Sequence, residues 1–286
     1  MTTTSPMRPL GFGEKLAYGC GNLFPTLVTA TGGMAMFFYT DVVGISAALI
    51  GTALLLVRLV DAVWDIIVGR WVDRTRTRWG QSRPFLLWAA PVAAVSMVLA
   101  FTAPPFDGQA ARIAWVLLTY TALWWSYSLI NIPFQSMPAL VAPDPDARLR
   151  LLGVNAFLLF IFVVGCGAGF PALKDALADG QPARGFQRAA MVYAVIGVLM
   201  TWLTFAVVRE RVAPAPVLRP DLRGDLAALW RSQAWRACLV ALGLIALLIG
   251  LPLAAGVYYF VAVHKAPQMI GPFMGVSGIG DRKSVV

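Results

Sequence analysis

The sequence is poor in charged residues and in the side chains that most enzymes use for catalysis. Charged residues make up 13% of its 286 positions, and it contains three cysteines and a single histidine, His264. The cysteines have no metal-ligand spacing, and there is neither a GxSxG motif nor a phosphate-binding glycine loop. The sequence therefore offers few side chains for catalysis, and an enzyme is not favoured. The cysteines are interpreted as small packing residues.

Apolar residues are abundant instead. They make up 59% of the chain, and the mean hydropathy is +0.72. These residues carry more apolar surface than the core of a soluble protein could bury. Windows of about 20 residues predict an all-α membrane protein with seven spans. These spans are 16–39, 47–69, 85–103, 113–134, 151–173, 189–208 and 237–263. The first is too long for a signal peptide, and no small-residue cleavage site follows it.

The net charge of +9 predicts topology. With the N-terminus in the cytoplasm, the inner segments hold fifteen lysines and arginines and the outer loops hold five. A three-to-one bias in short loops favours this orientation. The positive surface also attracts anionic membrane lipid, and no nucleic-acid partner is expected.

The second span is unusual because Arg58, Asp61 and Asp65 lie inside it, while the other predicted spans carry no acid or base. On a helix turning about 100° per residue, the three share one face. Each costs about 2.5 to 3.5 kcal/mol near the bilayer centre. One arginine cannot neutralise two carboxylates, so a cation pathway is favoured over an internal strut between helices. We expect this face to be exposed, with Arg58 as the main partner of both acids.

The order of segments is similar to the layout of major facilitator carriers, whose two six-helix halves rock around a midplane site. Residues 1–208 form six spans, 209–236 a polar cytoplasmic connector with an amphipathic end, and 237–263 a seventh span. We therefore expect a major facilitator fold, with the N-terminal six-helix half plus helix seven of a twelve-helix carrier. Residues 264–286 form a tail that ends in DRKSVV at 281–286, which resembles a translated sequencing adapter. We expect a truncated reading frame.

Several motifs carry a closer resemblance. The loop GRWVDRTRTRWGQSRP at 69–84 follows RLVDAVWD at 58–65, and the chain also contains KLAYG at 15–19, YTDVVG at 39–44 and NIPF at 131–134. Together they resemble the glycoside-pentoside-hexuronide cation symporter family, over about residues 15 to 265. The resemblance implies cation-coupled symport of a sugar or glycoside across the inner membrane. An amphipathic or lipid-like solute, and a non-transporting membrane scaffold, are the alternatives.

The resemblance also implies a cation site. Asp61 and Asp65 stand at the family's cation-binding aspartates, Arg58 at its arginine and Ser128 at a hydroxyl that assists the cation. Trp64 replaces the asparagine of melibiose-type carriers, which favours H+ over Na+ because sodium needs several oxygen ligands. Both coupling ions stay open, and no other cofactor or metal is expected.

The implied solute site is more divergent. Thr26, Asn131 and Gln135 stand where melibiose-type carriers have two aspartates and a tryptophan, and Tyr127 shares the face of Asn131 and Gln135. These side chains can bind the hydroxyls of a small carbohydrate, although without charge-assisted bonds. Hydrogen bonding between helices is the alternative for this stripe.

The resemblance further implies that the loop after the second span gates transport by latching helix ends. Its gating residues are Gly69, Asp73, Arg74, Arg78 and Gly80. The alternative is a basic topology anchor in which Asp73 pairs with an arginine. In the first span, Pro25 and glycines such as Gly19 and Gly21 predict either a broken, cavity-lining helix or close helix packing.

Overall fold

The computed structural model describes residues 10–212 and 222–258. Within these ranges the chain is helical and forms no β-strand. It divides into two compact units, Met1–Ala215 and Pro216–Val286. The all-α class predicted from hydropathy is confirmed.

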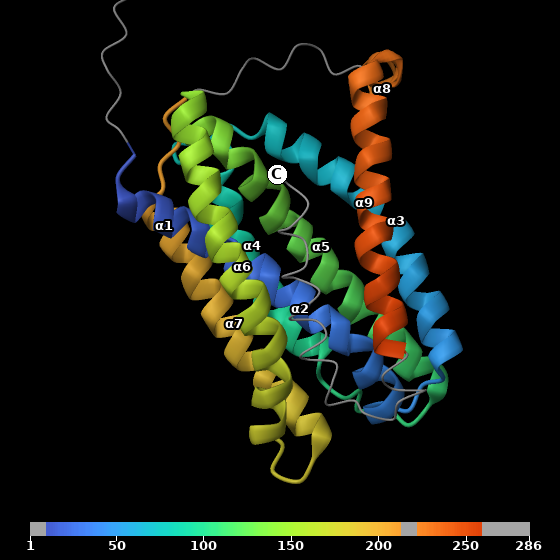
Figure 1. The fold of residues 1–286 in the computed structure, drawn as a ribbon. Helices are drawn as coiled ribbons and strands as arrows, with labels where there is room; N and C mark the ends of the chain where they lie inside the picture. The colour runs from blue at the N-terminus through green and yellow to red at the C-terminus, as the bar shows by residue number, and fades with distance from the viewer. Residues whose placement is uncertain (1–9, 213–221, 259–286) are drawn as a thin grey trace, which may run out of the picture. The chain divides into compact units, whose positions relative to one another are not determined.

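The first unit holds the helices from α1 to α7 (Figure 1). Its elements are α1 (Phe12–Gly21), α2 (Leu23–Phe37), the π-helical turn η1 (Phe38–Val42), α3 (Ala47–Arg74), α4 (Arg83–Ala100), α5 (Gln109–Val141), α6 (Pro145–Ala176) and α7 (Pro182–Val207). Among the described residues, five helices, α3 to α7, are long and apolar enough to cross a membrane. Each corresponds to one of the five spans predicted between residues 47 and 208.

The first predicted span is divided at Asn22 into α1 and α2. Pro25 has no N–H with which to bond the carbonyl of Gly21, and this accounts for the break. The Asn22 amide donates to Oδ1 of Asn155 on α6, at 3.3 Å. A Cβ atom on Gly21 would lie 2.6 Å from Oγ1 of Thr204, so glycine allows α1 to approach α7. The span is therefore both interrupted and closely packed.

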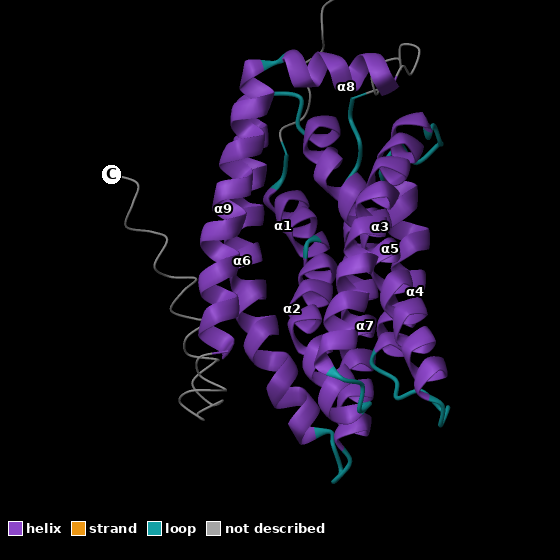
Figure 2. Ribbon diagram, turned by 90° about the vertical axis from the view of Figure 1, so that its right-hand side faces the viewer, coloured by secondary structure: helices purple, strands orange, loops and turns teal. Residues whose placement is uncertain are grey.

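The helices of this unit pack in a defined order. α1 and α2 contact α6 and α7, α4 contacts α5 and α7, and α3 lies on α5 at one edge (Figures 1 and 2). Phe38, Phe101, Phe170 and Phe186 form an aromatic cluster in the core. Because lipid tails are as apolar as leucine, such packing and interhelical hydrogen bonds stabilise the bundle more than hydrophobic burial does.

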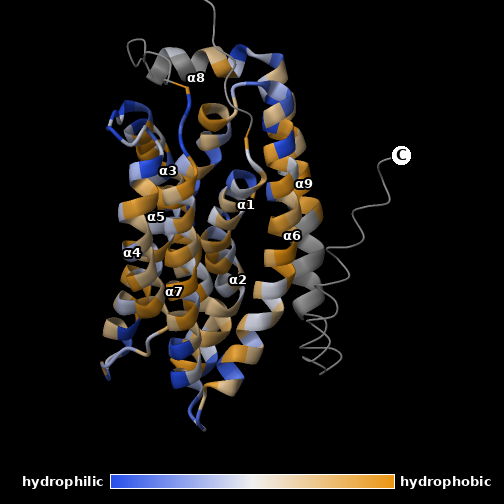
Figure 3. Cartoon of the chain, turned by 90° about the vertical axis from the view of Figure 1, so that its left-hand side faces the viewer, coloured by the Kyte–Doolittle hydropathy of each residue, from blue (hydrophilic) through white to orange (hydrophobic). Residues whose placement is uncertain are grey.

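The surface of the unit fits a lipid environment. Leu55, Leu59, Trp88 and Val195 are each more than half exposed. Figure 3 shows apolar residues along the helices and hydrophilic residues towards their ends. Soluble monomers rarely expose apolar patches this extensive. In a bilayer, helices satisfy every backbone polar group internally and can face lipid directly.

The second unit consists, in its described part, of α8 (Leu222–Arg231) and α9 (Gln233–Tyr258). Ser232 separates them: its N–H donates to the carbonyls of Ala228 and Leu229, and its Oγ accepts from the N–H of Trp235 at 3.3 Å, as an N-cap does. Figure 2 shows α8 crossing the end of α9. The end of the seventh predicted span at 259–263, the tail at 264–286 and the adapter-like residues lie outside the described residues.

Candidate cation-binding site

The charged trio lies on α3, where an ion pair joins the first two members. Nη1 of Arg58 is 3.8 Å from Oδ2 of Asp61, and their side chains are 47% and 11% exposed. Asp65 is exposed, whereas Asp61 is buried. The prediction that all three are exposed is therefore wrong for Asp61. Its side chain continues the stripe of buried α3 residues that includes Val57 and Val68.

Two tryptophans of α5 contact the α3 residues on either side of Asp61 in the sequence. The guanidinium carbon of Arg58 lies over the Trp124 ring, 3.4 Å from its centroid. Six residues further along α3, Trp64 stacks on Trp125 with ring centroids 4.5 Å apart, and its Nε1 donates to the Trp125 carbonyl at 3.1 Å. Trp64 therefore contributes packing and a donor to this site, and offers no oxygen ligand to a cation.

Asp61 has one carboxylate oxygen available. Its Oδ1 is buried and has no hydrogen-bond partner within the described part of the chain. A buried carboxylate oxygen without a partner is costly, and a bound proton or cation would relieve that cost. Asp65 lies close enough to interact electrostatically with Asp61. No group of three or more His, Cys, Asp or Glu side chains comes together among the described residues.

Of the polar residues predicted on α5, Tyr127 lies near the charged trio. Ser128 is buried, and Tyr127 is close enough to interact electrostatically with Arg58, Asp61 and Asp65. The α3 acids and Tyr127 of the neighbouring helix α5 therefore lie in one region, and Ser128 follows Tyr127 directly in α5. Their role as ligands stays a prediction.

The residues predicted to bind solute lie on two helices. Asn131 is half-buried and Gln135 exposed on α5, with Nε2 of Gln135 at 3.5 Å from Oδ1 of Asn131. Thr26 is buried on α2, and its hydroxyl donates to the carbonyl of Asn22 at 2.7 Å. Its proton is thus engaged within its own helix. The assignment of these residues to a solute stays a prediction.

The loop between α3 and α4 contains the predicted gating residues. Oδ1 of Asp73 accepts from Nε2 of Gln81 at 3.4 Å, and Arg76 donates to the Asp73 carbonyl at 3.0 Å. The Arg78 guanidinium lies over the ring of Trp79. Gly69 and Arg74 lie in the last turns of α3, and Arg74 is exposed. These contacts fold the loop back on the end of α3.

Glu210 is a functional candidate that the sequence reasoning missed. Its carboxylate accepts three backbone N–H groups at the start of α4, from Gln81 at 2.7 Å, Ser82 at 2.8 Å and Arg83 at 3.1 Å. Anions are stabilised at helix N-termini by these unpaired donors and by the helix dipole. Gly80 has φ +114°, and a Cβ there would lie 2.4 Å from Cδ of Glu210. The sequence signal for this contact was an acid, Glu210, shortly after the sixth predicted span, together with a glycine, Gly80, shortly before the third.

The residues after Glu210 extend this contact to other helices. Nη2 of Arg211 lies 2.8 and 2.7 Å from the two carboxylate oxygens of Glu14 on α1. The N–H groups of Arg211 and Val212 donate to the carbonyl of Leu140 on α5. Residues 210–212, here called the Glu210 clamp, thus join the ends of α1, α4 and α5 beside the end of α7.

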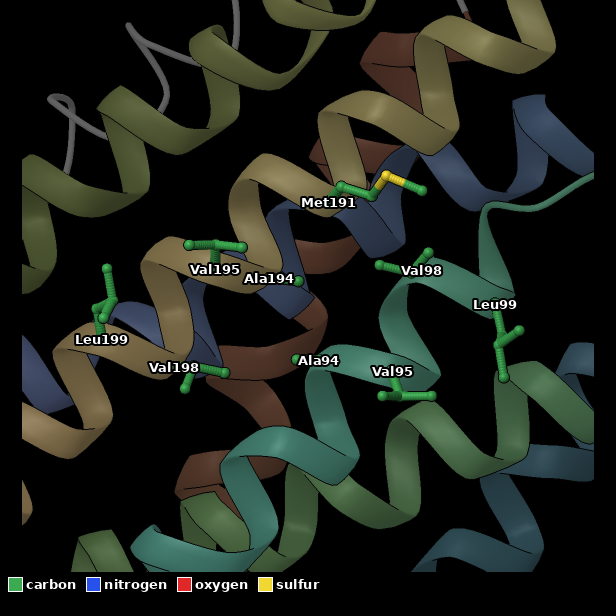
Figure 4. Close-up of a pocket in the computed structure, with 9 residues that line it drawn as sticks. All are labelled: Ala94, Val95, Val98, Leu99, Met191, Ala194, Val195, Val198 and Leu199. Carbon is green, nitrogen blue, oxygen red and sulfur yellow. The ribbon is translucent and has the colours of Figure 1, made fainter.

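A pocket between α4 and α7 is a weaker candidate (Figure 4). It has a volume of about 420 Å³ and is lined by apolar side chains such as Val95, Leu99, Val195 and Leu199. A sugar needs hydrogen-bonding partners, and this lining supplies none from its side chains. The pocket is therefore not assigned to the solute.

An all-helical membrane bundle with a buried carboxylate between two spans, one of whose oxygens has no hydrogen-bond partner among the described residues, is typical of secondary transporters. The profile of the family described as MFS/sugar transport protein matches residues 17–280. The chain belongs to this family, and the family resemblance of its motifs is confirmed.

Individual relatives agree with this assignment. The chain is 34% identical to YagG of Escherichia coli K12, a candidate glycoside/cation symporter, over 80% of this chain and 50% of the relative. It is 30% identical to the inner membrane symporter YicJ of the same organism, over 94% and 58% of the two chains. It is 34% identical to the isoprimeverose transporter of Lactiplantibacillus pentosus, over 70% and 42%. The chain spans about half the length of the curated relatives it matches.

Proposed function

We propose that this chain supplies the cation-binding half of a secondary active carrier that couples H+ or Na+ to the symport of a sugar or glycoside. The observation that carries the proposal is the buried Asp61, whose Oδ1 lacks a partner among the described residues and lies near a second carboxylate. Family membership and the relatives described as symporters support it. The same relatives support a bacterial inner membrane, and the loop charges support a cytoplasmic N-terminus.

The charges on α3 explain why a cation is needed. Asp61 and Asp65 together exceed the charge of Arg58 by one, and an unbalanced charge inside a bilayer is unfavourable. A cation bound at Oδ1 of Asp61, with Asp65 and the Ser128 hydroxyl as further oxygen ligands, restores neutrality. The neutral site favours the conformation that accepts solute. Whatever the cation adds to solute affinity, the solute adds to cation affinity.

The surroundings of Asp61 favour a proton over sodium. Sodium requires several oxygen ligands at once, whereas a proton requires only one carboxylate oxygen. Trp64 fills the position next to Asp65 with an N–H donor that is already bonded to the Trp125 carbonyl. We therefore propose H+ as the coupling ion.

The rest of the half serves solute binding and movement. Tyr127, Asn131 and Gln135 on α5, with Thr26 on α2, provide groups for carbohydrate hydroxyls. The loop from Gly69 to Gly80 and the Glu210 clamp hold helix ends together while the half moves as a body. A second helical half would close the solute cavity, in keeping with relatives about twice as long as this chain.

The test is cation-driven uptake of isoprimeverose and of a glucuronide by a carrier in which this half is completed by a second one. Asp61→Asn or Asp65→Asn should abolish cation-driven uptake and leave membrane insertion intact. Asp107→Asn, at an exposed residue outside the helices, is the matched control and should transport normally. Uptake that stays cation-dependent in both α3 variants would overturn the proposal.

A further inference from the structure

We propose that Trp124 is a positioning residue of the cation site: its indole face holds the Arg58 guanidinium and keeps it from closing on Asp61. The inference rests on the proposed cation site. It concerns how Arg58 and the coupling cation compete for the same carboxylate.

The geometry shows an ion pair held short of full contact. Charge-assisted hydrogen bonds between guanidinium and carboxylate are about 2.7 to 2.9 Å long. The Arg58–Asp61 pair is 3.8 Å, although residues three apart on a helix are neighbours and Arg58 is half exposed. The guanidinium carbon instead lies 3.4 Å from the Trp124 ring centroid.

The indole is itself held in place. Trp124 is 5% exposed, and its ring contacts Tyr120 and Tyr127, with centroids 6.0 and 5.1 Å away. A ring fixed in this way offers the guanidinium a rigid face. The Tyr120 hydroxyl lies beside the same guanidinium and adds a polar neighbour.

This arrangement determines how much of Asp61 is left for a cation. Arg58 neutralises part of the charge from a distance, while Oδ1 stays unpartnered. Without the indole face, Arg58 would be free to turn towards Asp61 and bind both carboxylate oxygens. The coupling cation would then have to displace a guanidinium.

The experiment measures how accessible Asp61 is to a carboxyl reagent. The purified 286-residue chain is treated with a hydrophobic carbodiimide, which labels protonated carboxyl groups, and labelling is quantified by peptide mass spectrometry. Asp107, which is exposed and lies outside the helices, serves as the internal reference. Four chains form a double-mutant cycle: wild type, Trp124→Leu, Arg58→Gln and the double variant.

We expect Trp124→Leu to lower the Asp61/Asp107 labelling ratio by about 2- to 30-fold, the range of cation–π energies expressed as an equilibrium change. Arg58→Gln should raise the ratio, and Trp124→Leu should have no further effect in that background. Trp124→Phe, which keeps an aromatic face, should fall between wild type and the leucine variant. Trp88→Leu, at a residue 68% exposed on α4, is the control and should leave the ratio unchanged.

Two results would overturn the inference. One is an equal fall in both backgrounds, which would mean that Trp124 only supports the local fold. The other is an unchanged or higher ratio in Trp124→Leu. The labelling ratio does not depend on transport, so failure of the proposed symport, seen as cation-dependent uptake by Asp61→Asn, is a separate outcome.

Discussion

Removing the carboxylate of Glu210 should destabilise the first unit. Three backbone N–H groups at the start of α4 would lose their acceptor in Glu210→Ala, at positions where the helix itself provides none. A hydrogen bond to a charged group contributes about 1.5 to 3 kcal/mol, and the interaction with the helix dipole about 0.3 to 1 kcal/mol. Because Glu210 is only half-buried, water can bond to the freed N–H groups in the variant and offset part of the lost interaction energy. We estimate a loss of about 2 kcal/mol in the free energy of unfolding.

Thermal unfolding of the detergent-solubilised chain measures this loss. For a unit of about 200 residues, 2 kcal/mol corresponds to a fall of about 4 to 8 °C in Tm. Gly80→Ala should also lower Tm, because its new Cβ would meet the Glu210 carboxylate and its φ is positive. In the Glu210→Ala background, Gly80→Ala should lower Tm by less, because the clash with the Glu210 carboxylate is gone and only the strain of a positive φ at alanine remains. A Tm for Glu210→Ala within about 1 °C of wild type would refute the clamp, and Asp107→Asn gives the baseline for losing an exposed acid.

Three further predictions concern coupling, mechanism and packing. In the completed carrier, a sodium gradient at fixed pH should not drive uptake, because Trp64 offers no oxygen; sodium-driven uptake without proton movement would show the ion assignment wrong. The 286-residue chain reconstituted alone should insert into vesicles but carry no solute, since it provides one wall of a two-half cavity; saturable, cation-dependent uptake would contradict the two-half mechanism. Asn155→Leu should lower the unfolding free energy by about 1 kcal/mol by removing the bond to Asn22, and circular dichroism melts that match wild type would exclude that role.

The membrane-spanning helices could be predicted from the sequence because each long span is itself a run of hydrophobic residues. The helices from α3 to α7 fall on predicted spans, since twenty or so apolar residues suffice to specify a membrane helix. The break at Asn22 was signalled by Pro25, but its position depended on local hydrogen bonding that hydropathy does not report. The start of α9 at Gln233, four residues before the predicted span, follows from the Ser232 cap.

The candidate site was readable only in part. Acids inside a span are conspicuous, so Asp61 and Asp65 could be selected from the sequence. That Asp61 is buried and Asp65 exposed depends on how α3 is rotated against α5, which the charges alone do not determine. Trp124 could not be separated from ordinary packing tryptophans, because its role comes from the neighbour that it meets. Glu210 was hidden for the same reason, since its partners lie about 130 residues away.

The arrangement of the site also indicates how ion binding can be linked to movement. Asp61 comes from α3, whereas Ser128, Trp124 and Trp125 come from α5. If Asp61 and Ser128 share a cation as proposed, the affinity for that cation depends on the spacing of these two helices. The Glu210 clamp joins the ends of α1, α4 and α5, while α3 meets it through the loop at 75–82. α3 lies at the edge of the unit with α5 as its main neighbour. A cation that bridges α3 and α5 would therefore favour one spacing of the pair, and by reciprocity a solute that favours that spacing would raise the affinity for the cation.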